Sequence, residues 1–384
     1  MRDPVFIGSA FVAKYPEGGG NFWVPLQYLL GLRALGVDAH WVELVWRQES
    51  ANRAEEILAS FPSYLRALGV EEWVTLVVYP ESERDQPSGP VQHIGLPPET
   101  LWERARDGIL LNLANSIPAP LRAHFARTVL FDIDPGPFQI WARDTDLGVG
   151  THDAYLTIGQ NLGAPDCPVP AGAVPWQRVW PVVHLPAWPP QSAPDGGRYT
   201  TVTQWWNGTW VQLGEETLDG NKRSGFLGMV DLPERVDVAL ELAANIHPGE
   251  LEDRALLARH RWHLADPVAV AGTPVKFRDY VQRSRGEFSC AKPAYVRTRP
   301  GWVSDRTVCY LASGRPCVVQ DTGAAHLLPS SPGLRFFTTR DEAAEALRAV
   351  ERDYRTAARA ARTLAEEIFS TAAVLPGLLR AVGA

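Results

Sequence analysis

The stretch from Gly301 to Gly323 is predicted to form a loop, a short helix and a buried strand that ends in Asp-Thr-Gly. Ser304 suits the helix N-cap, because its hydroxyl can accept a hydrogen bond from a backbone N–H two or three residues later. A Gly-Arg-Pro sequence then predicts the end of the helix. Because a helix N-terminus offers free N–H donors and partial positive charge, Ser304, Arg306 and Thr307 are candidates for holding a phosphate group.

Candidate general bases lie in the first half of the chain, at predicted strand ends and loops. A base must reach the proton that it removes, and Asp134 follows a predicted strand at its carboxyl end. His152 and Asp153 are the other candidate catalytic residues. Neighbouring side chains on a strand point in different directions, so these two do not form a dyad by themselves. The alternative for each residue is the capping of a turn.

A glycine-rich loop follows the first predicted strand and consists of Gly18, Gly19, Gly20 and Asn21. Glycines let backbone N–H groups approach a ligand closely, and Asn21 is predicted to cap the next helix. The alternative is a tight turn with no ligand. The loop lacks a full GxGxxG sequence, so a redox dinucleotide is not supported.

Strands and helices alternate along both halves of the chain, which predicts parallel sheets covered by helices. In the first half, the predicted strands are 4–10, 37–44, 73–79, 108–113 and 128–133, with helices at 22–35 and 51–68. A proline-rich stretch at 165–197 separates the halves. In the second half, strands are predicted at 199–204, 267–271 and 288–291, and helices at 232–245, 273–284 and 341–369. Ligands bind at the carboxyl ends of such strands.

Composition bounds the classes of protein. The chain has 384 residues, 45% of them hydrophobic and 21% charged, which is typical of a soluble globular protein of about two domains. A net charge of −7 argues against non-specific nucleic-acid binding. No apolar run is long enough to span a membrane, and the first residues do not resemble a signal peptide, so we expect a cytoplasmic protein. The four cysteines lack metal-ligand spacing and are expected to be buried thiols.

Residues 200–369 resemble the donor-binding domain of GT-B glycosyltransferases. The resemblance rests on Gly286-Glu287-Phe288, Lys292, Ser304-Asp305-Arg306, the sequence from Tyr310 to Pro316, and Gln320-Asp321-Thr322-Gly323. It implies an α/β fold of two Rossmann-like domains whose parallel sheets face a central cleft. The implied domains are 1–190 on the acceptor side and 198–365 for the sugar nucleotide, with 366–384 as a helix returning to the N-terminal domain.

The resemblance also implies roles for residues. Lys222 is expected to meet the donor diphosphate. Glu287 and Lys292 are further expected donor contacts, with Lys292 on a phosphate, unless the two simply pair with each other. Lys276 and Phe277 lie where the nucleobase is expected. Asp305 suits ribose or sugar hydroxyls, because a carboxylate beside a phosphate would repel it. Asp321, Thr322 and Gly323 end a strand where sugar hydroxyls are expected, and a plain turn is their alternative.

One departure from the family pattern is clear. Many retaining members carry a Glu-x7-Glu pair, and this chain has Gly301 and Cys309 at those positions, which favours inversion. We expect a metal-independent enzyme with no cofactor, whose partners are a nucleotide-diphosphate sugar and an acceptor that is a small molecule or glycan. A homodimer stays open. The alternatives are a sugar-nucleotide epimerase or hydrolase on the same fold, and a non-catalytic protein that binds sugar nucleotides.

Overall fold

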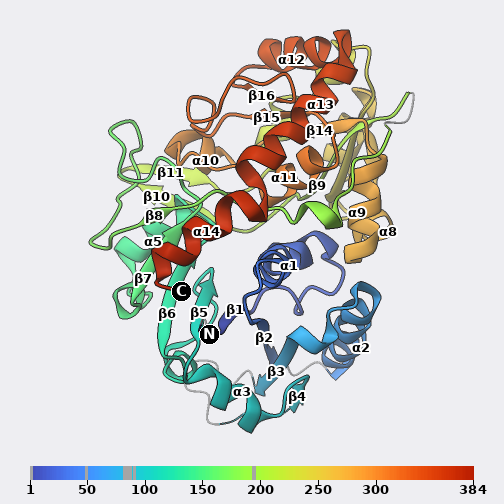
Figure 1. Cartoon of the computed structure of the whole chain (residues 1–384). Coiled ribbons are helices and arrows are strands. Elements are labelled where there is room, and N and C mark those ends of the chain that lie inside the picture. The colour runs from blue at the N-terminus through green and yellow to red at the C-terminus, as the bar shows by residue number, and fades with distance from the viewer. Residues whose placement is uncertain (1–2, 48–50, 81–88, 90–91, 193–195) are drawn as a thin grey trace.

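A computed structural model describes residues 3–47, 51–80, 89, 92–192 and 196–384. Two α/β units are stacked one above the other, with the N-terminal unit below in the view of Figure 1. We call them the N-terminal and C-terminal domains. Each contains one sheet whose strands are covered by helices, as the alternation of the sequence predicts.

The sheet of the N-terminal domain has the strand order β4-β3-β2-β1-β5-β6-β7-β8, and every pair except β3–β4 is parallel. Its strands are β1 (Val5–Ser9), β2 (Ala39–Arg47), β3 (Val74–Pro80), β4 (Gln92–Ile94), β5 (Ile109–Leu113), β6 (Arg127–Asp132), β7 (Ala154–Thr157) and β8 (Gln177–Arg178). Its helices are α1 (Gly19–Ala34), α2 (Ala51–Leu68), α3 (Pro98–Ala105), α4 (Ala119–Arg122) and α5 (Pro137–Asp144), with short turns at η1 (Glu71–Trp73), η3 (Val149–Thr151) and η4 (Leu185–Ala187). Successive strands are added on one side of β1 as far as β4 and on its other side from β5 onwards, so the strand order reverses between β1 and β5.

The sheet of the C-terminal domain is wholly parallel, with the order β13-β12-β9-β14-β15-β16. Its strands are β9 (Tyr199–Gln204), β12 (Leu240–Asn245), β13 (His263–Ala265), β14 (Gly286–Ser289), β15 (Cys317–Gln320) and β16 (Leu334–Phe337), beside a hairpin of β10 (Trp210–Leu213) and β11 (Glu216–Asp219). Its helices are α6 (Arg223–Leu227), η5 (Leu232–Glu234), α7 (Leu251–Arg259), α8 (Pro267–Ala271), α9 (Pro274–Arg283), α10 (Pro293–Thr298), α11 (Asp305–Ala312), α12 (Arg340–Arg352) and α13 (Tyr354–Leu364).

The chain returns to the N-terminal domain at its end. After α13, a π-helical turn, η6 (Ala365–Phe369), leads into α14 (Thr371–Val382), which crosses to the N-terminal domain in Figure 1. There α14 packs on α1 so closely that a Cβ atom at Gly31 would overlap the side chain of Thr371. The predicted return of the C-terminal helix is therefore confirmed.

Helices α1 and α9 form a second contact between the domains. The indole Nε1 of Trp23 donates to the backbone oxygen of Pro274 at 2.9 Å. A Cβ atom at Gly19 would overlap the carbonyl oxygens of Ala271 and Thr273, and one at Gly20 would lie 2.9 Å from the ring of Phe277. The absence of side chains at these two glycines is what lets the helices meet.

Two predicted elements of the C-terminal domain are wrong. The predicted helix 232–245 is the turn η5 followed by strand β12, because Leu240 and Leu242 are buried between β9 and β13 and this packing overrides the helical propensity of the Ala, Glu and Leu residues. The predicted strand 267–271 is helix α8. Asp266 caps it by accepting from the backbone N–H of Val268 at 2.9 Å, and a proline occupies its first position.

Candidate functional site

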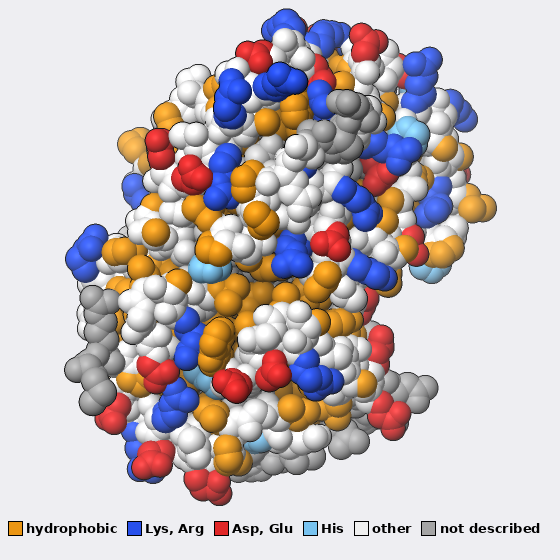
Figure 2. Space-filling model, turned by 45° about the vertical axis from the view of Figure 1, so that its right-hand side comes forward, with side chains coloured by type: hydrophobic (Ala, Val, Ile, Leu, Met, Phe, Trp, Pro, Cys, Tyr) orange, Lys and Arg blue, Asp and Glu red, His pale blue; other side chains and the backbone are white. Residues whose placement is uncertain are grey.

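A cleft of about 1210 Å³ lies between the carboxyl ends of the two parallel sheets. In the N-terminal domain, the ends of β1, β2, β3 and β6, part of α2 and the loop after β5 bound it. In the C-terminal domain, it is bounded by the end of β9 and the starts of α6, α10 and α11. In Figure 2, hydrophobic side chains gather in the band where the two halves meet, with Lys and Arg side chains above and below. Ligands of open parallel sheets bind at this edge.

Three basic residues line the wall of the cleft that the C-terminal domain contributes: Lys222, Lys292 and Arg306. Lys222 directly precedes α6 and is only 7% exposed. Lys292 precedes α10, and Arg306 lies in the first turn of α11; their side chains are 18% and 13% exposed. Three helices that start at the same edge of the sheet thus bring three basic side chains together, and we call them the cationic cluster.

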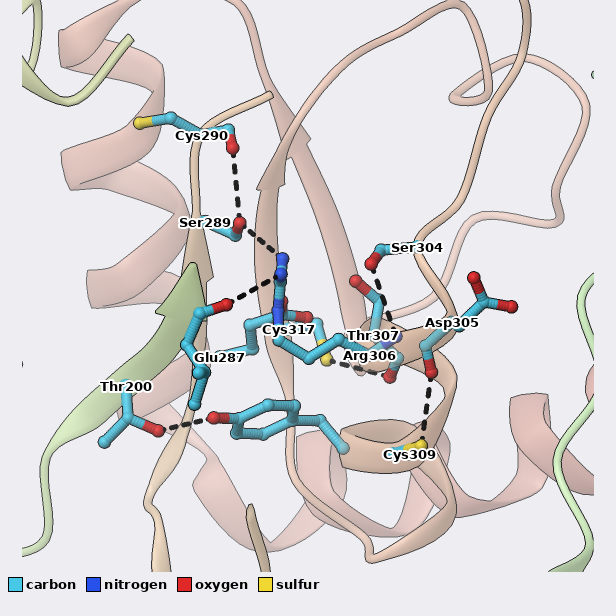
Figure 3. Close-up of polar contacts among 12 residues, drawn as sticks. Thr200, Glu287, Ser289, Cys290, Ser304, Asp305, Arg306, Thr307, Cys309 and Cys317 are labelled. Atoms are coloured by element: carbon cyan, nitrogen blue, oxygen red, sulfur yellow. Dashed lines mark hydrogen bonds and ion pairs between the residues drawn. The ribbon is translucent and has the colours of Figure 1, made fainter. Parts of the chain in front are cut away.

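Arg306 is held from below by a buried carboxylate. Its Nε donates to Glu287 at 2.7 Å, and Glu287 is fully buried on β14. Its Nη1 and Nη2 donate to the backbone oxygen of Val202 at 3.1 Å and to the hydroxyl of Ser289 at 2.7 Å (Figure 3). The sequence left open a pair between Glu287 and Lys292, but the partner of Glu287 is Arg306. This fixed guanidinium is part of the wall before any ligand arrives.

The ammonium of Lys222 is in an unfavourable place for a charge. Burial lowers the pKa of Lys222 well below its usual value; Arg306 and Lys292 lower it too, and Glu287 opposes them. The three basic groups of the cluster thus share one buried carboxylate, that of Glu287. Because a buried charge without a partner is costly, a bound anion would stabilise the cluster and restore the charge of Lys222.

The start of α11 is built as the sequence predicts. Ser304 is the N-cap, and its hydroxyl accepts from the backbone N–H of Arg306 at 3.3 Å. Ser304 lines the cleft, whereas Thr307 is 2% exposed. Asp305 is half-buried, and burial raises its pKa to about 6. The thiol of Cys309 donates to the backbone oxygen of Asp305 at 3.2 Å, so α11 has a buried thiol one turn from its start.

Asp134 reaches the cleft from the N-terminal domain. Its carboxylate lies 3.6 Å from the ammonium of Lys292, so one ion pair spans the two walls. The backbone N–H of Asp134 donates to Asp132 at 3.0 Å. Asp132 is buried and also accepts from Gln139 at 2.6 Å and Thr157 at 2.7 Å, and burial raises its pKa to about 6. Asp132 therefore organises the turn, and Asp134 is the carboxylate that faces the cleft.

His152 and Asp153 do not line the cleft in the part of the chain that the structure describes. Asp153 lies at the amino end of β7, where it accepts from the backbone N–H of Thr128 at 2.7 Å. The ring of His152 contacts Arg122 and Asn112, and burial beside Arg122 lowers its pKa to about 4. Both residues have structural partners, so we do not carry their predicted catalytic role into the proposal below.

The glycine-rich loop differs from its prediction. Helix α1 begins at Gly19 with Gly18 as its N-cap, so Asn21 lies in the first turn and does not cap the helix. Asn21 is exposed and lines the cleft. Gly19 and Gly20 are required by the contact with α9, which is a packing reason rather than a ligand-binding one.

The remaining predicted donor contacts lie outside the described lining of the cleft. Phe277 is 3% exposed and packs on Gly20 and Trp188, while Lys276 points to solvent from α9.

The turn from Asp321 to Gly323 is likewise structural. Asp321 accepts from the backbone N–H groups of Gly323 at 3.0 Å and Ala325 at 3.1 Å, and Thr322 donates to Trp302 at 2.6 Å. These contacts match the plain turn that the sequence left as the alternative.

Glu43 is a site residue that sequence reasoning missed. It is fully buried on β2, and its carboxylate accepts from the backbone N–H groups of Val12 at 2.8 Å and Ala13 at 2.9 Å and from the hydroxyl of Ser9. Burial raises its pKa to about 7. Glu43 thereby fixes the loop between β1 and α1, which lines the cleft. An acid inside an apolar strand was the signal that could have revealed it.

No family model matches the chain, and no curated protein matches it. Solved structures do. HepE from Anabaena, in complex with UDP and glucose, is 11% identical with a TM-score of 0.57, and the match covers 100% of both chains. The GT-B architecture of two facing parallel sheets is common to both.

The chain has the GT-B fold. Two further GT-B structures match its length: an α-glucosyltransferase in complex with UDP and a 13-mer DNA (10% identity, TM-score 0.58, 99% of both chains) and sucrose-phosphate synthase from Thermosynechococcus elongatus (12% identity, TM-score 0.51, 99% of this chain and 98% of that one). At these identities, the likeness establishes the fold alone.

Two features are absent from the described residues. Among them, no helix is both long and apolar enough to cross a membrane. Within the same residues, no group of three or more His, Cys, Asp or Glu side chains is arranged to hold a metal ion.

Proposed function

We propose that the protein is a glycosyltransferase that moves a sugar from a nucleotide-diphosphate sugar, with a UDP-sugar as the first candidate, to an acceptor hydroxyl. The observation that carries this proposal is the cationic cluster, which lies at the carboxyl edge of the C-terminal sheet in a GT-B fold. UDP is present in the structures of HepE and of the α-glucosyltransferase, which supports the choice of nucleotide.

The cluster suits the leaving group of such a transfer. When the bond between sugar and diphosphate breaks, negative charge grows on the diphosphate, and preorganised cations stabilise that charge most strongly. Arg306 is already fixed by Glu287 and Ser289, so little reorganisation is needed. Because three basic side chains meet at this place, we propose that they neutralise the diphosphate without a divalent ion.

Asp134 is the proposed base. In the free protein its carboxylate pairs with Lys292, which is also one of the cations of the cluster. A diphosphate competes for Lys292, because it carries more charge than one carboxylate. Donor binding therefore releases Asp134 to accept the proton of the acceptor hydroxyl. We propose inversion, in which the acceptor oxygen attacks the anomeric carbon from the face opposite the leaving diphosphate.

A thermal-shift panel of UDP, GDP, dTDP and ADP tests the donor site. A ligand at 100 times its dissociation constant stabilises the folded state by about 2.7 kcal/mol, so UDP is expected to raise the melting temperature by a few degrees. The absence of a shift with all four nucleotides would contradict the proposal.

Incubation of the donor without an acceptor separates transfer from the alternatives. A transferase is expected to leave the UDP-sugar largely intact over hours and to consume it once an acceptor is added. Rapid conversion to an epimer or to free sugar would instead identify an epimerase or hydrolase.

A further inference from the structure

The wall of the cleft in the N-terminal domain is apolar. Six partly exposed side chains line it at the ends of β1, β2 and β6 and on α1 and α2. We call these residues the apolar subsite: Phe11, Tyr15, Val24, Trp46, Leu58 and Ile133. Tyr15 is 47% exposed, and Trp46 is half-buried, with its ring beside that of Tyr79 at 5.5 Å between ring centroids. Ring faces are therefore available at the surface of the cleft.

Four uncharged polar side chains also line this wall among the described residues: Asn21, Gln92, Asn115 and Ser116. Of the described lining residues in this domain, Lys14 and Asp134 are the charged ones. The ammonium of Lys14 lies 5.1 Å from the centroid of the Tyr15 ring. The side-chain amide of Asn115 donates to the backbone oxygen of Leu147 at 2.7 Å, so its N–H group already has a partner within the protein. Asp134 is thus the carboxylate of the described lining that lies opposite the cationic cluster.

This distribution of polar groups constrains the acceptor. A sugar chain carries several hydroxyls on each ring, and each hydroxyl that is buried without a hydrogen-bond partner costs binding free energy. A flat aromatic molecule gives up few hydrogen bonds to water when it binds to this wall, and its faces replace water on Phe11, Tyr15 and Trp46. One hydroxyl is all that Asp134 needs for the reaction.

We propose that the acceptor is a flat, hydroxylated aromatic molecule, whose ring system lies in the apolar subsite and whose hydroxyl points at Asp134. This inference rests on the proposed function, because the cationic wall is then occupied by the donor. The acceptor oxygen forms a bond to the anomeric carbon of the sugar, and the bond from that carbon to the diphosphate breaks. The diphosphate leaves with the electron pair, and the hydroxyl proton passes to the carboxylate of Asp134.

Binding of 2-naphthol to the full-length protein, measured by isothermal titration calorimetry with UDP present, tests the proposal without any turnover. Substitution Trp46→Ala is expected to raise the dissociation constant of 2-naphthol about 10-fold by removing one ring face. Trp46→Phe keeps a ring and should stay within about 3-fold of the parent protein. The matched control is Trp210→Ala, because Trp210 is 56% exposed and lies outside the described lining of the cleft.

Each outcome decides between substrate classes. Naphthol binding that Trp46→Ala weakens and Trp210→Ala does not, together with formation of a naphthyl glycoside, supports the aromatic acceptor. Equal loss in both variants, or no naphthol binding while maltotetraose or dispersed phosphatidylglycerol binds in the presence of UDP, overturns it. In those cases UDP still binds, so only the acceptor inference fails. If UDP itself does not bind, the proposed function fails first.

Discussion

The two walls of the cleft solve different problems with different materials. The C-terminal wall is polar and fixed: Arg306 makes hydrogen bonds with three groups, and a buried carboxylate sets its position. Most described residues of the N-terminal wall are apolar, and Asp134 is the carboxylate among them that faces the cleft beside Lys292. A charged ligand needs directional partners in place beforehand, whereas an apolar ligand needs mainly contact surface. The difference agrees with the proposed placement of the donor on the C-terminal domain and of the acceptor on the N-terminal domain.

The strongest way to break the polar wall is to remove its foundation. Glu287→Ala leaves Arg306 without its buried partner, and breaking such a pair typically costs about 3–5 kcal/mol of folding stability. Urea unfolding measures this loss. The control is Glu216→Ala, whose pair with Arg297 joins side chains that are 47% and 52% exposed, and whose loss is expected to stay below about 1 kcal/mol. Equal losses of unfolding free energy in the two variants would show that the buried pair of Glu287 with Arg306 stabilises the fold no more than a surface pair does.

The role of Asp134, the carboxylate of the described N-terminal wall, is tested by Asp134→Asn. If Asp134 takes the acceptor proton, sugar transfer should fall by about 100-fold or more, since general base catalysis contributes 10²-fold at least. UDP should bind no more weakly, because Lys292 has lost its competing partner. Asp153→Asn is the comparison, and it should keep the rate within about 2-fold of the parent protein. Rate measurements with saturating donor distinguish the two variants. A larger loss of rate in Asp153→Asn than in Asp134→Asn would identify Asp153, beside β7, as the base.

A smaller effect is expected for one cation of the polar wall. Lys222→Met removes the contact that we propose for the diphosphate. Charged contacts of this kind contribute about 2 kcal/mol, so UDP should bind about 30-fold more weakly by calorimetry. Lys276→Met removes a lysine that points to solvent from α9, outside the described lining of the cleft, and it should leave UDP affinity unchanged. Similar losses in both variants would place the nucleotide elsewhere.

The loop that carries Phe11 and Tyr15 should respond to pH through Glu43. Its folded-state pKa of about 7 is above the value of an unfolded glutamate, so the folded state binds more protons between these values and stability falls as pH rises. From pH 5 to 7 this fall amounts to about 2 kcal/mol for Glu43 alone. Glu43→Gln should remove that component from the free energy of unfolding measured across this range. An unchanged slope would contradict it.

Local signals decided what the sequence predicted well. Ser304 and the Gly-Arg-Pro stop define α11 within a dozen residues, so both ends of this helix were predictable. The alternation of strands and helices predicted both sheets for the same reason. Strand β12 was missed because its Ala, Glu and Leu residues favour a helix in isolation, and only burial between two other strands reverses that preference.

The site was harder to predict than the fold, because its contacts join distant segments. Lys222 and Lys292 were predicted from the resemblance to GT-B glycosyltransferases, and Arg306 from its place at a helix N-terminus. The pair of Lys292 with Asp134, however, joins two domains and leaves no trace in either local sequence. The glycines before α1 illustrate the opposite error. Glycine is needed there because a neighbouring helix packs closely against it. Sequence alone does not distinguish a glycine that makes room for another part of the chain from one that makes room for a ligand.

The contact at those glycines has a mechanical consequence. Because Gly19 lies directly against the carbonyl groups of Ala271 and Thr273, the two domains meet at this point with no side chain between them. Asn21 and Val24 of the same helix line the cleft, so a displacement of α1 at Gly19 would alter the separation of its two walls. A methyl group at Gly19 would overlap those carbonyl groups and push the two domains apart, so it would change the separation of the two walls when no substrate is bound.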